Sequence, residues 1–166
     1  EEQRSNLVRQ SADISNAVWA KFGAPAVTTN AATAPDGTMT AASLLLSPTA
    51  GFYQSNTAVG GSAYTTSIWL RADSPITLRQ AVTDGISTPT LAPISVTSAW
   101  QRCVLTKTIA SAATHVEIQV DGTGGGGLVY VWGGQVELGS TASSYIPTTT
   151  AAATRAADRQ YLSGQT

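Results

Sequence analysis

The sequence predicts an all-β fold, a two-sheet antiparallel jelly-roll sandwich, on three observations. Apolar and polar residues alternate with a period of two in several short segments. Glycine-rich turn signals separate these segments at short intervals. Apart from a short helical turn expected near residues 11–18, no long window repeats apolar residues at the helical spacing. Many short strands at this spacing are typical of two sheets that bury their apolar faces against each other.

The clearest alternation lies in residues 64–70 and 115–120. Successive side chains of a strand point to opposite faces, so each segment has one apolar and one more polar face. In the first segment, Trp69 falls on the face opposite its apolar neighbours. We therefore expect five side chains between the two sheets: Ile68, Leu70, Val116, Ile118 and Val120.

The remaining strands are placed by apolar runs between turn signals. They are expected at residues 26–29, 42–46, 76–82, 100–107 and 128–138. Turns are expected at Asp36-Gly37 and across the four glycines 124–127, which we interpret as a loop between two strands and not as a linker. A β-bulge is expected at Gly133-Gly134, because glycine inside a strand weakens regular pairing.

The composition limits the classes of function. At 166 residues the chain suits one domain, which we place at residues 1–157, with a polar tail or connector at residues 158–166. Charged residues make up 11% of the sequence, and the formal net charge is -1 without a cluster of Lys and Arg. This balance argues against binding to nucleic acid. Apolar runs are far too short to span a bilayer, so no membrane insertion is expected.

Residues suited to catalysis are few. His115 lies on the polar face of an expected strand, and the lone Cys103 is expected to be a small buried hydrophobic residue. Glu117 and Glu137 are the carboxylates that fall within expected strands. Glycoside hydrolysis would need two carboxyl groups facing one groove, and a sugar-contacting or structural role is favoured for each. We therefore predict that the protein is not an enzyme.

No cofactor is expected. The glycine run 124–127 lacks the Lys-Ser/Thr pair of a phosphate-binding loop and precedes a strand, and no His/Cys metal spacing is present. Binding of a structural calcium ion remains an alternative, because this cation needs only carboxylate and carbonyl oxygens from loops. Asp13, Asp36 or Asp121 could supply such oxygens.

The aromatic residues point to a contact surface. Four Trp and five Tyr stand against two Phe, and such amphipathic rings stack on sugars while polar groups bond the hydroxyls. Core packing is the alternative role for each ring. Trp69 is singled out because its neighbours claim the buried face and leave it outward beside Arg71. Strand parity predicts a carbohydrate-binding face of Trp69, Arg71, Glu117, Gln119, Gln135 and Glu137, with Tyr53 at the rim.

A series of short motifs runs in order along nearly the whole chain. The motifs are Asn6-Leu7-Val8, residues 15–19, residues 34–38, residues 64–72, Trp100-Gln101-Arg102, residues 131–139, residues 144–148 and residues 154–158. Taken in this order, they resemble a family of phage-associated domains related to jelly-roll carbohydrate-binding modules. Several look architectural: Asp36-Gly37 as a turn, Trp19 and Trp100 as core anchors, and Tyr145-Ile146-Pro147 as a strand end.

The resemblance implies a β-sandwich on tail, fibre or head-decoration proteins at the virion surface. It implies a non-catalytic module whose partners are a glycan of the host cell surface and other virion proteins. The alternative is a structural decoration or fibre subunit that contacts proteins without binding sugar. A polysaccharide-degrading enzyme is a third hypothesis, which requires paired carboxylates in one cleft. Low charge and a hydroxyl-rich surface also favour a homo-oligomer, with a trimer as one candidate.

Overall fold

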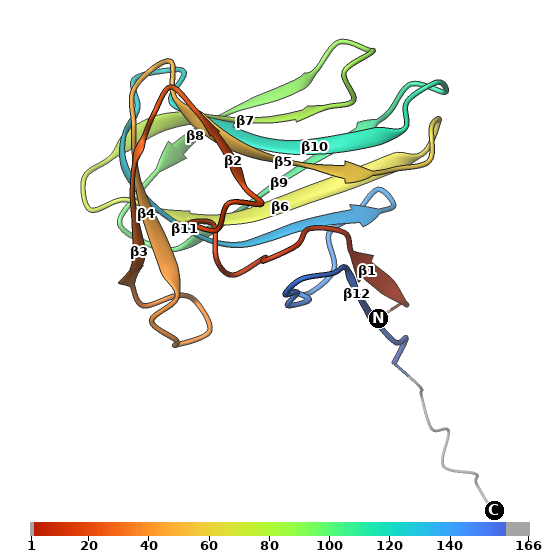
Figure 1. Ribbon diagram of the computed structural model, residues 1–166, viewed down its shortest axis with the longest axis horizontal. Helices are drawn as coiled ribbons and strands as arrows, with labels where there is room; N and C mark the ends of the chain where they lie inside the picture. The colour runs from red at the N-terminus through yellow and green to blue at the C-terminus, as the bar shows by residue number, and fades with distance from the viewer. Residues whose placement is uncertain (1, 159–166) are drawn as a thin grey trace, which may run out of the picture.

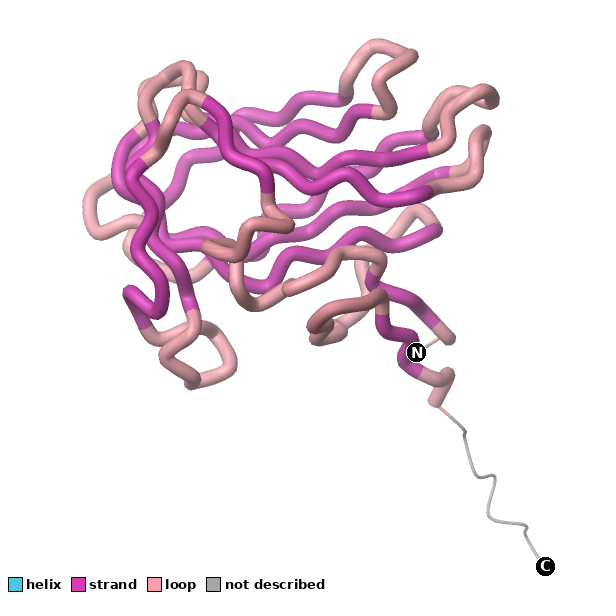
Figure 2. Tube along the Cα trace, viewed as in Figure 1, coloured by secondary structure: helices cyan, strands magenta, loops and turns pink. Residues whose placement is uncertain are grey.

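The computed structural model describes residues 2–158 and contains twelve β-strands and no helix within that range (Figure 1, Figure 2). Sheet I has the strand order β2 (Ala20–Phe22), β5 (Gly51–Thr57), β10 (His115–Asp121), β7 (Ile76–Thr83) and β8 (Thr90–Val96). Sheet II has the order β3 (Ala26–Ala32), β4 (Ala41–Leu46), β11 (Gly127–Leu138), β6 (Ala63–Arg71) and β9 (Gln101–Thr108). A small third sheet pairs β1 (Arg4–Asn6) with β12 (Ala153–Arg155).

The predicted fold class is confirmed. All pairings in sheets I and II are antiparallel, and the two five-stranded sheets pack as a jelly-roll sandwich. Each of the seven predicted strands is present, as β3, β4, β6, β7, β9, β10 and β11. The expected helical turn near residues 11–18 is a series of hydrogen-bonded turns, in which residues 13, 16 and 19 each donate to the carbonyl three residues earlier.

Two of the longer strands, β5 and β8, are absent from the prediction. Each departs from regular alternation: β5 has polar side chains on its inward face, and β8 contains a proline. The inward side chains of β5 include Gln54 and Asn56, both buried. Gln54 satisfies its amide by accepting from Arg9 N at 2.7 Å and donating to Arg9 O at 2.9 Å. β8 carries Pro93, which lacks an amide donor, and it lies at the edge of sheet I where a proline is tolerated.

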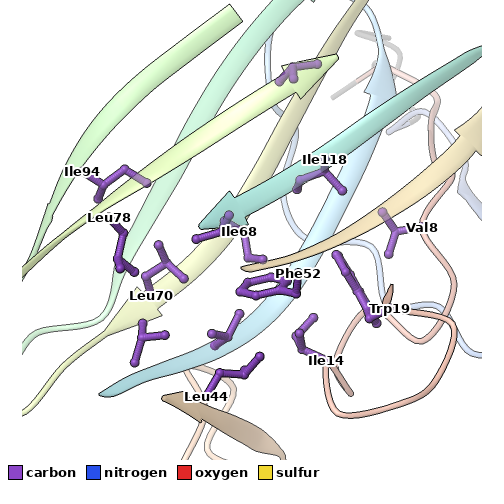
Figure 3. Close-up of a cluster of buried hydrophobic side chains, with 14 of the residues drawn as sticks. Val8, Ile14, Trp19, Leu44, Phe52, Ile68, Leu70, Leu78, Ile94 and Ile118 are labelled. Carbon is purple, nitrogen blue, oxygen red and sulfur yellow. The ribbon is translucent and has the colours of Figure 1, made fainter. Parts of the chain in front are cut away.

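The core lies between sheets I and II (Figure 3). The five side chains predicted for this position, Ile68, Leu70, Val116, Ile118 and Val120, are all fully buried there. Trp19 is also fully buried, as predicted, and its ring packs edge-on against Phe52 with centroids 6.0 Å apart. Its Nε1 donates to Gln10 O at 3.0 Å, so the indole brings no unsatisfied donor into the core.

The predicted bulge is present in β11. The pairing of β11 with β6 shifts between Trp132 and Gln135, where three steps on β11 oppose two steps on β6. Gly133 has a φ of +67°, a left-handed conformation that favours glycine. The extra residue keeps Val136 buried in the core beyond the bulge, so the apolar face of β11 stays continuous.

The outer face of sheet II carries a second hydrophobic cluster. Its buried members are Ala32, Ala34, Ala41 and Trp132, and the partly buried side chains packed on it include Trp69, Trp100, Tyr130 and Tyr145. Trp132 and Tyr145 approach to 4.4 Å between centroids. The residues around Thr33 and Tyr145 come from outside the strands of sheet II, so loops contribute to this cluster.

Two architectural predictions are wrong. Trp100 is not in the core between the sheets: it lies half-buried in the outer cluster, where its Nε1 donates to Thr33 O at 3.1 Å. Tyr145-Ile146-Pro147 is not a strand end, because residues 139–152 contain no strand. This segment instead holds itself to the body through Asn6 and Thr148.

The small sheet brings the two ends of the described chain together (Figure 1). The ladder runs from Arg4 opposite Arg155 to Asn6 opposite Ala153. The predicted domain of residues 1–157 is therefore tied to the sandwich up to Arg155. The predicted tail of residues 158–166 lies outside the described residues except for Asp158.

Candidate binding face

The outer face of sheet I gathers polar side chains that point away from the core. We call it the open face and define it by Tyr53, Arg79, His115, Glu117, Gln119 and Asp121, with Ala81, Thr83 and Leu91 beside them. These residues share the outward parity of their strands, because the residues between them point into the core. Within residues 2–158, their side-chain hydrogen bonds and ring contacts come from sheet I and from the loops after β7 and β10.

The register places the open face in rows that cross the strands. Gln119 of β10 lies opposite Tyr53 of β5 on one side and Ala81 of β7 on the other, and Ala81 lies opposite Leu91 of β8. This row crosses four strands, about 14 Å at the usual spacing between strands. A second row places Glu117 between Ser55 and Thr83.

Asp121 is the centre of a hydrogen-bond network at one end of the open face. Its Oδ2 accepts from Arg79 Nη2 at 2.9 Å, from Arg79 Nε at 3.2 Å and from Gln119 Nε2 at 2.7 Å, while its Oδ1 accepts from Thr123 N at 3.0 Å. Burial by itself would raise the pKa of Asp121, but these donors together hold that pKa below its ordinary value. The Asp121 carboxylate is therefore ionised and fully engaged.

Glu117 stands in the opposite situation. Its side chain is half-buried on the open face, and among residues 2–158 no hydrogen bond or salt bridge holds its carboxylate. Burial raises the pKa of Glu117, and the nearby His115 opposes that rise. A half-buried carboxylate without a donor is free to accept hydrogen bonds from a ligand.

Tyr53 supplies the aromatic group of the open face. Its ring is half-buried and lies beside Phe22 of β2, with centroids 6.4 Å apart and planes inclined by 43°. Among the described residues, no hydrogen bond engages its hydroxyl. An apolar ring surface and a polar tip are thus presented together, next to Gln119.

Of the seven predicted site residues, Tyr53, Glu117 and Gln119 lie on the open face, and the other four lie on the outer face of sheet II. The expectation that all seven share one face is wrong. Strand alternation tells which side chains leave the core, but not which sheet a strand joins. β10 joins sheet I, while β6 and β11 join sheet II, so the two sets are on opposite sides of the sandwich.

Trp69 faces outward from β6, as predicted, but it is half-buried in the outer cluster and not exposed. Arg71 holds its guanidinium carbon 4.6 Å from the centroid of Tyr130 and 5.9 Å from that of Trp100. It also lies 3.4 Å from Asp73, which accepts from the Tyr130 hydroxyl at 2.9 Å. Both predicted residues thus contact the protein's own side chains.

Gln135 and Glu137 point outward from β11 and are nevertheless completely buried. Gln135 accepts from Ile146 N at 2.7 Å, and Glu137 accepts from Ser143 N at 3.0 Å and from the Ser143 hydroxyl. These bonds hold the segment after β11 against sheet II. Glu117 and Glu137 lie on different sheets and do not face one groove, as the hydrolase hypothesis for this pair required.

The predicted binding face did not include Arg79, and it did not include Asp121, which was considered as a calcium ligand. The signal for this pair lies in their outward parity, but their opposition depends on the pairing of β7 with β10, which no local pattern gives. Among residues 2–158 no cluster of three or more His, Cys, Asp or Glu side chains could hold a metal ion. The same residues include no helix long and apolar enough to cross a membrane.

A hollow of about 450 Å³ opens at one end of the sandwich, beside β1. Leu7, Val59, Tyr64 and Leu138 contribute to its lining, which is mainly apolar. Arg4, the charged residue in that lining, is already bonded to Leu138 O, and its second amino group lies 3.4 Å from Glu2. The open face is the better candidate site, because the Tyr53 hydroxyl and the Glu117 carboxylate lie near each other there and no hydrogen bond within residues 2–158 engages either.

No family model and no curated protein matches the sequence. Solved structures do match its fold. The enzymatically active domain of tailspike protein 4 from bacteriophage CBA120 has a TM-score of 0.63 at 16% identity over 80% of this chain. The match covers 21% of the tailspike chain, so this chain spans about a fifth of that protein's length.

Two matches extend over nearly the whole of the other chain. The C-terminal family 22 carbohydrate-binding module of a Clostridium thermocellum protein has a TM-score of 0.63 at 15% identity, covering 84% of this chain and 97% of that one. A xylan-binding domain from Paenibacillus barcinonensis has a TM-score of 0.61 at 15% identity, covering 83% and 94%. At these identities the matches establish the jelly-roll fold that this chain shares with carbohydrate-binding modules.

Proposed function

We propose that the protein is a non-catalytic glycan-binding module and that its saccharide lies across the open face. The observation that carries the proposal is the adjacency of Tyr53, Gln119 and Glu117 on a sheet face where their polar tips point outward. An aromatic ring offers a surface for the apolar face of a pyranose, and amide and carboxylate groups bond its hydroxyls. The row from Tyr53 to Leu91 is long enough to contact more than one sugar ring.

The structural neighbours support a saccharide as the ligand. One was solved as a xylan-binding domain, and the family 22 module was studied for the role of cleft residues in ligand binding. A fold by itself does not specify a function, so the proposal depends on the groups that this chain places on its own face. Those groups are hydroxyls, amides and one free carboxylate, which match the hydroxyl-rich surface of a glycan.

We further propose that the module works on a phage particle, at the virion surface, where it attaches to a polysaccharide of the host. The ordered motifs along the sequence and the match to a phage tailspike support this setting. A non-catalytic role is supported by the position of Glu117 and Glu137 on different sheets, since hydrolysis by this pair would require both at one glycosidic bond.

The test is a glycan array probed with the full chain, followed by calorimetry on the saccharides it retains. Tyr53→Ala should weaken their binding about tenfold or more, because it removes the ring of the open face. Tyr130→Ala is the matched control, since it deletes a half-buried tyrosine from the outer face of sheet II. Its affinity should equal that of the wild type. Loss of binding in the Tyr130 variant alone, with both variants folded, would contradict the placement.

A second candidate function is that of a structural subunit that contacts other copies of this chain. The observation in its favour is an exposed apolar pair, Leu45 of β4 and Leu128 of β11, which lie directly opposite each other on the outer face of sheet II. This pair is 53% and 44% exposed. Because it lies on the other side of the sandwich from the open face, both functions are compatible in one molecule.

A further inference from the structure

We infer that Glu117 makes the open face selective for uncharged saccharides over saccharides that carry carboxylate, sulfate or phosphate groups. The inference rests on the proposed glycan binding and adds the chemical class of the ligand. It follows from the balance of charges on the open face, taken side chain by side chain.

The charged pair on the open face is internally compensated. Arg79 donates twice to the Asp121 carboxylate, and Gln119 donates to the same oxygen. The Asp121 carboxylate offsets the charge of this guanidinium, so Arg79 attracts an anionic ligand less strongly than an unpaired arginine would. The open face therefore presents no uncommitted arginine in its central rows.

Glu117 lies in the next row, and among residues 2–158 no salt bridge or hydrogen bond engages its carboxylate. Ser55 and Thr83, its opposite residues on β5 and β7, carry hydroxyls and no charge. His115, two residues earlier on β10, is the group whose charge acts on Glu117 among the described residues. Any saccharide that follows the row of Glu117 must therefore lie against a carboxylate.

Partial burial of Glu117 makes this charge effective. Water screens a charge less where the side chain is half-buried, so a second anion close by is repelled more strongly than at an exposed site. A neutral saccharide meets no such penalty, since its hydroxyls donate to the carboxylate oxygens. Discrimination of this kind depends on repulsion of the wrong ligand as much as on attraction of the right one.

The experiment uses an array on which each neutral hexose oligomer is printed beside its C6-oxidised uronic acid counterpart. The wild-type protein should bind the neutral members. Its affinity for their oxidised counterparts should be lower by at least about tenfold. Glu117→Gln keeps the shape of the side chain and one accepting oxygen while removing the charge. It should lower the ratio of neutral to oxidised binding about tenfold, because it removes the repulsion of the oxidised members and also weakens the hydrogen bonds from the neutral ones.

Asp73→Asn is the matched control, because it removes one negative charge from an exposed side chain beside Arg71, on the other side of the sandwich. Its ratio of neutral to oxidised binding should equal that of the wild type. Equal binding of both members by the wild type, or an unchanged ratio in Glu117→Gln, would overturn the charge selectivity while leaving glycan binding intact. Binding of no saccharide by any of the three proteins would overturn glycan binding and the selectivity together.

Discussion

Trp69 illustrates how far a single residue can be understood from its neighbours. Its outward direction follows from the buried positions of Ile68 and Leu70 on either side. Its burial follows from Trp132, which lies opposite it on β11, and from the loops that join the outer cluster. An outward side chain is exposed only where nothing else packs on that face, and loops pack on this one.

Trp69→Ala is therefore expected to reduce stability and not glycan affinity. Deleting a half-buried indole from the outer cluster should lower the free energy of unfolding by about 2 kcal/mol, less than for a fully buried ring. Urea unfolding measures this change. Val104→Ala, on the same outer face and 48% exposed, serves as the control and should change stability by about 0.5 kcal/mol at most.

Calorimetry on the Trp69 variant with a retained saccharide provides the second measurement. A variant as stable as the wild type but with about tenfold weaker binding would return the site to the face that the sequence predicted.

The bulge of β11 depends on two glycines, one for its backbone conformation and the other for its lack of a Cβ atom. Gly133 adopts a positive φ, and a Cβ on Gly134 would lie 2.6 Å from the ring of Trp19. Trp19 is fully buried and its Nε1 is bonded to Gln10 O, so this ring has little freedom to move. Backbone and indole therefore approach each other closely at Gly134, which ties the bulge to the main core.

Gly134→Ala should consequently destabilise the fold by about 1–3 kcal/mol, because the added methyl group overpacks a dense core. Thermal and urea unfolding measure the loss. The atoms in the way belong to the six-membered ring of the indole, so the matching background is Trp19→Phe, which removes part of that bulk.

In the Trp19→Phe background, Gly134→Ala should cost clearly less than in the wild type, as expected for two residues in direct contact. If the two substitutions have additive effects, the contact between residue 134 and the indole is not the source of the loss.

At the scale of the whole molecule, the two outer faces have different environments. The outer face of sheet II holds the second hydrophobic cluster. In Figure 1, the small sheet of β1 and β12 lies on the same side of the sandwich as sheet II. Leu45 and Leu128 are still exposed on the outer face of sheet II. The open face of sheet I carries polar groups instead. This asymmetry is the basis for our proposal that a ligand contacts sheet I and that a protein partner contacts sheet II.

Self-association is therefore expected through sheet II. Light scattering at increasing concentration should show an oligomer of the chain, and Leu45→Glu should shift it to the monomer, because a charge opposite Leu128 would be buried in the contact. Leu91→Glu is the control on the open face, where Leu91 is 51% exposed, and should leave the oligomer intact. A wild-type chain that stays monomeric throughout would rule out this contact.

The sequence by itself determined the fold class, seven strands, the five core side chains and the bulge. These features depend on periodicity along the chain, which a strand converts directly into an inner and an outer face. The strand β5 was not predicted, because its inward side chains Gln54 and Asn56 are polar. Their hydrogen bonds are not visible in the alternation of apolar and polar residues.

Only the tertiary structure decided which outward residues share a face. Glu117 and Glu137 have the same local signature, a carboxylate between apolar neighbours in a strand, yet one is half-buried on the open face and the other is sealed beneath Ser143. The difference arises from the sheet that each strand joins and from the loop that packs on it. Both are set by contacts between residues far apart in the chain, so no local pattern records them.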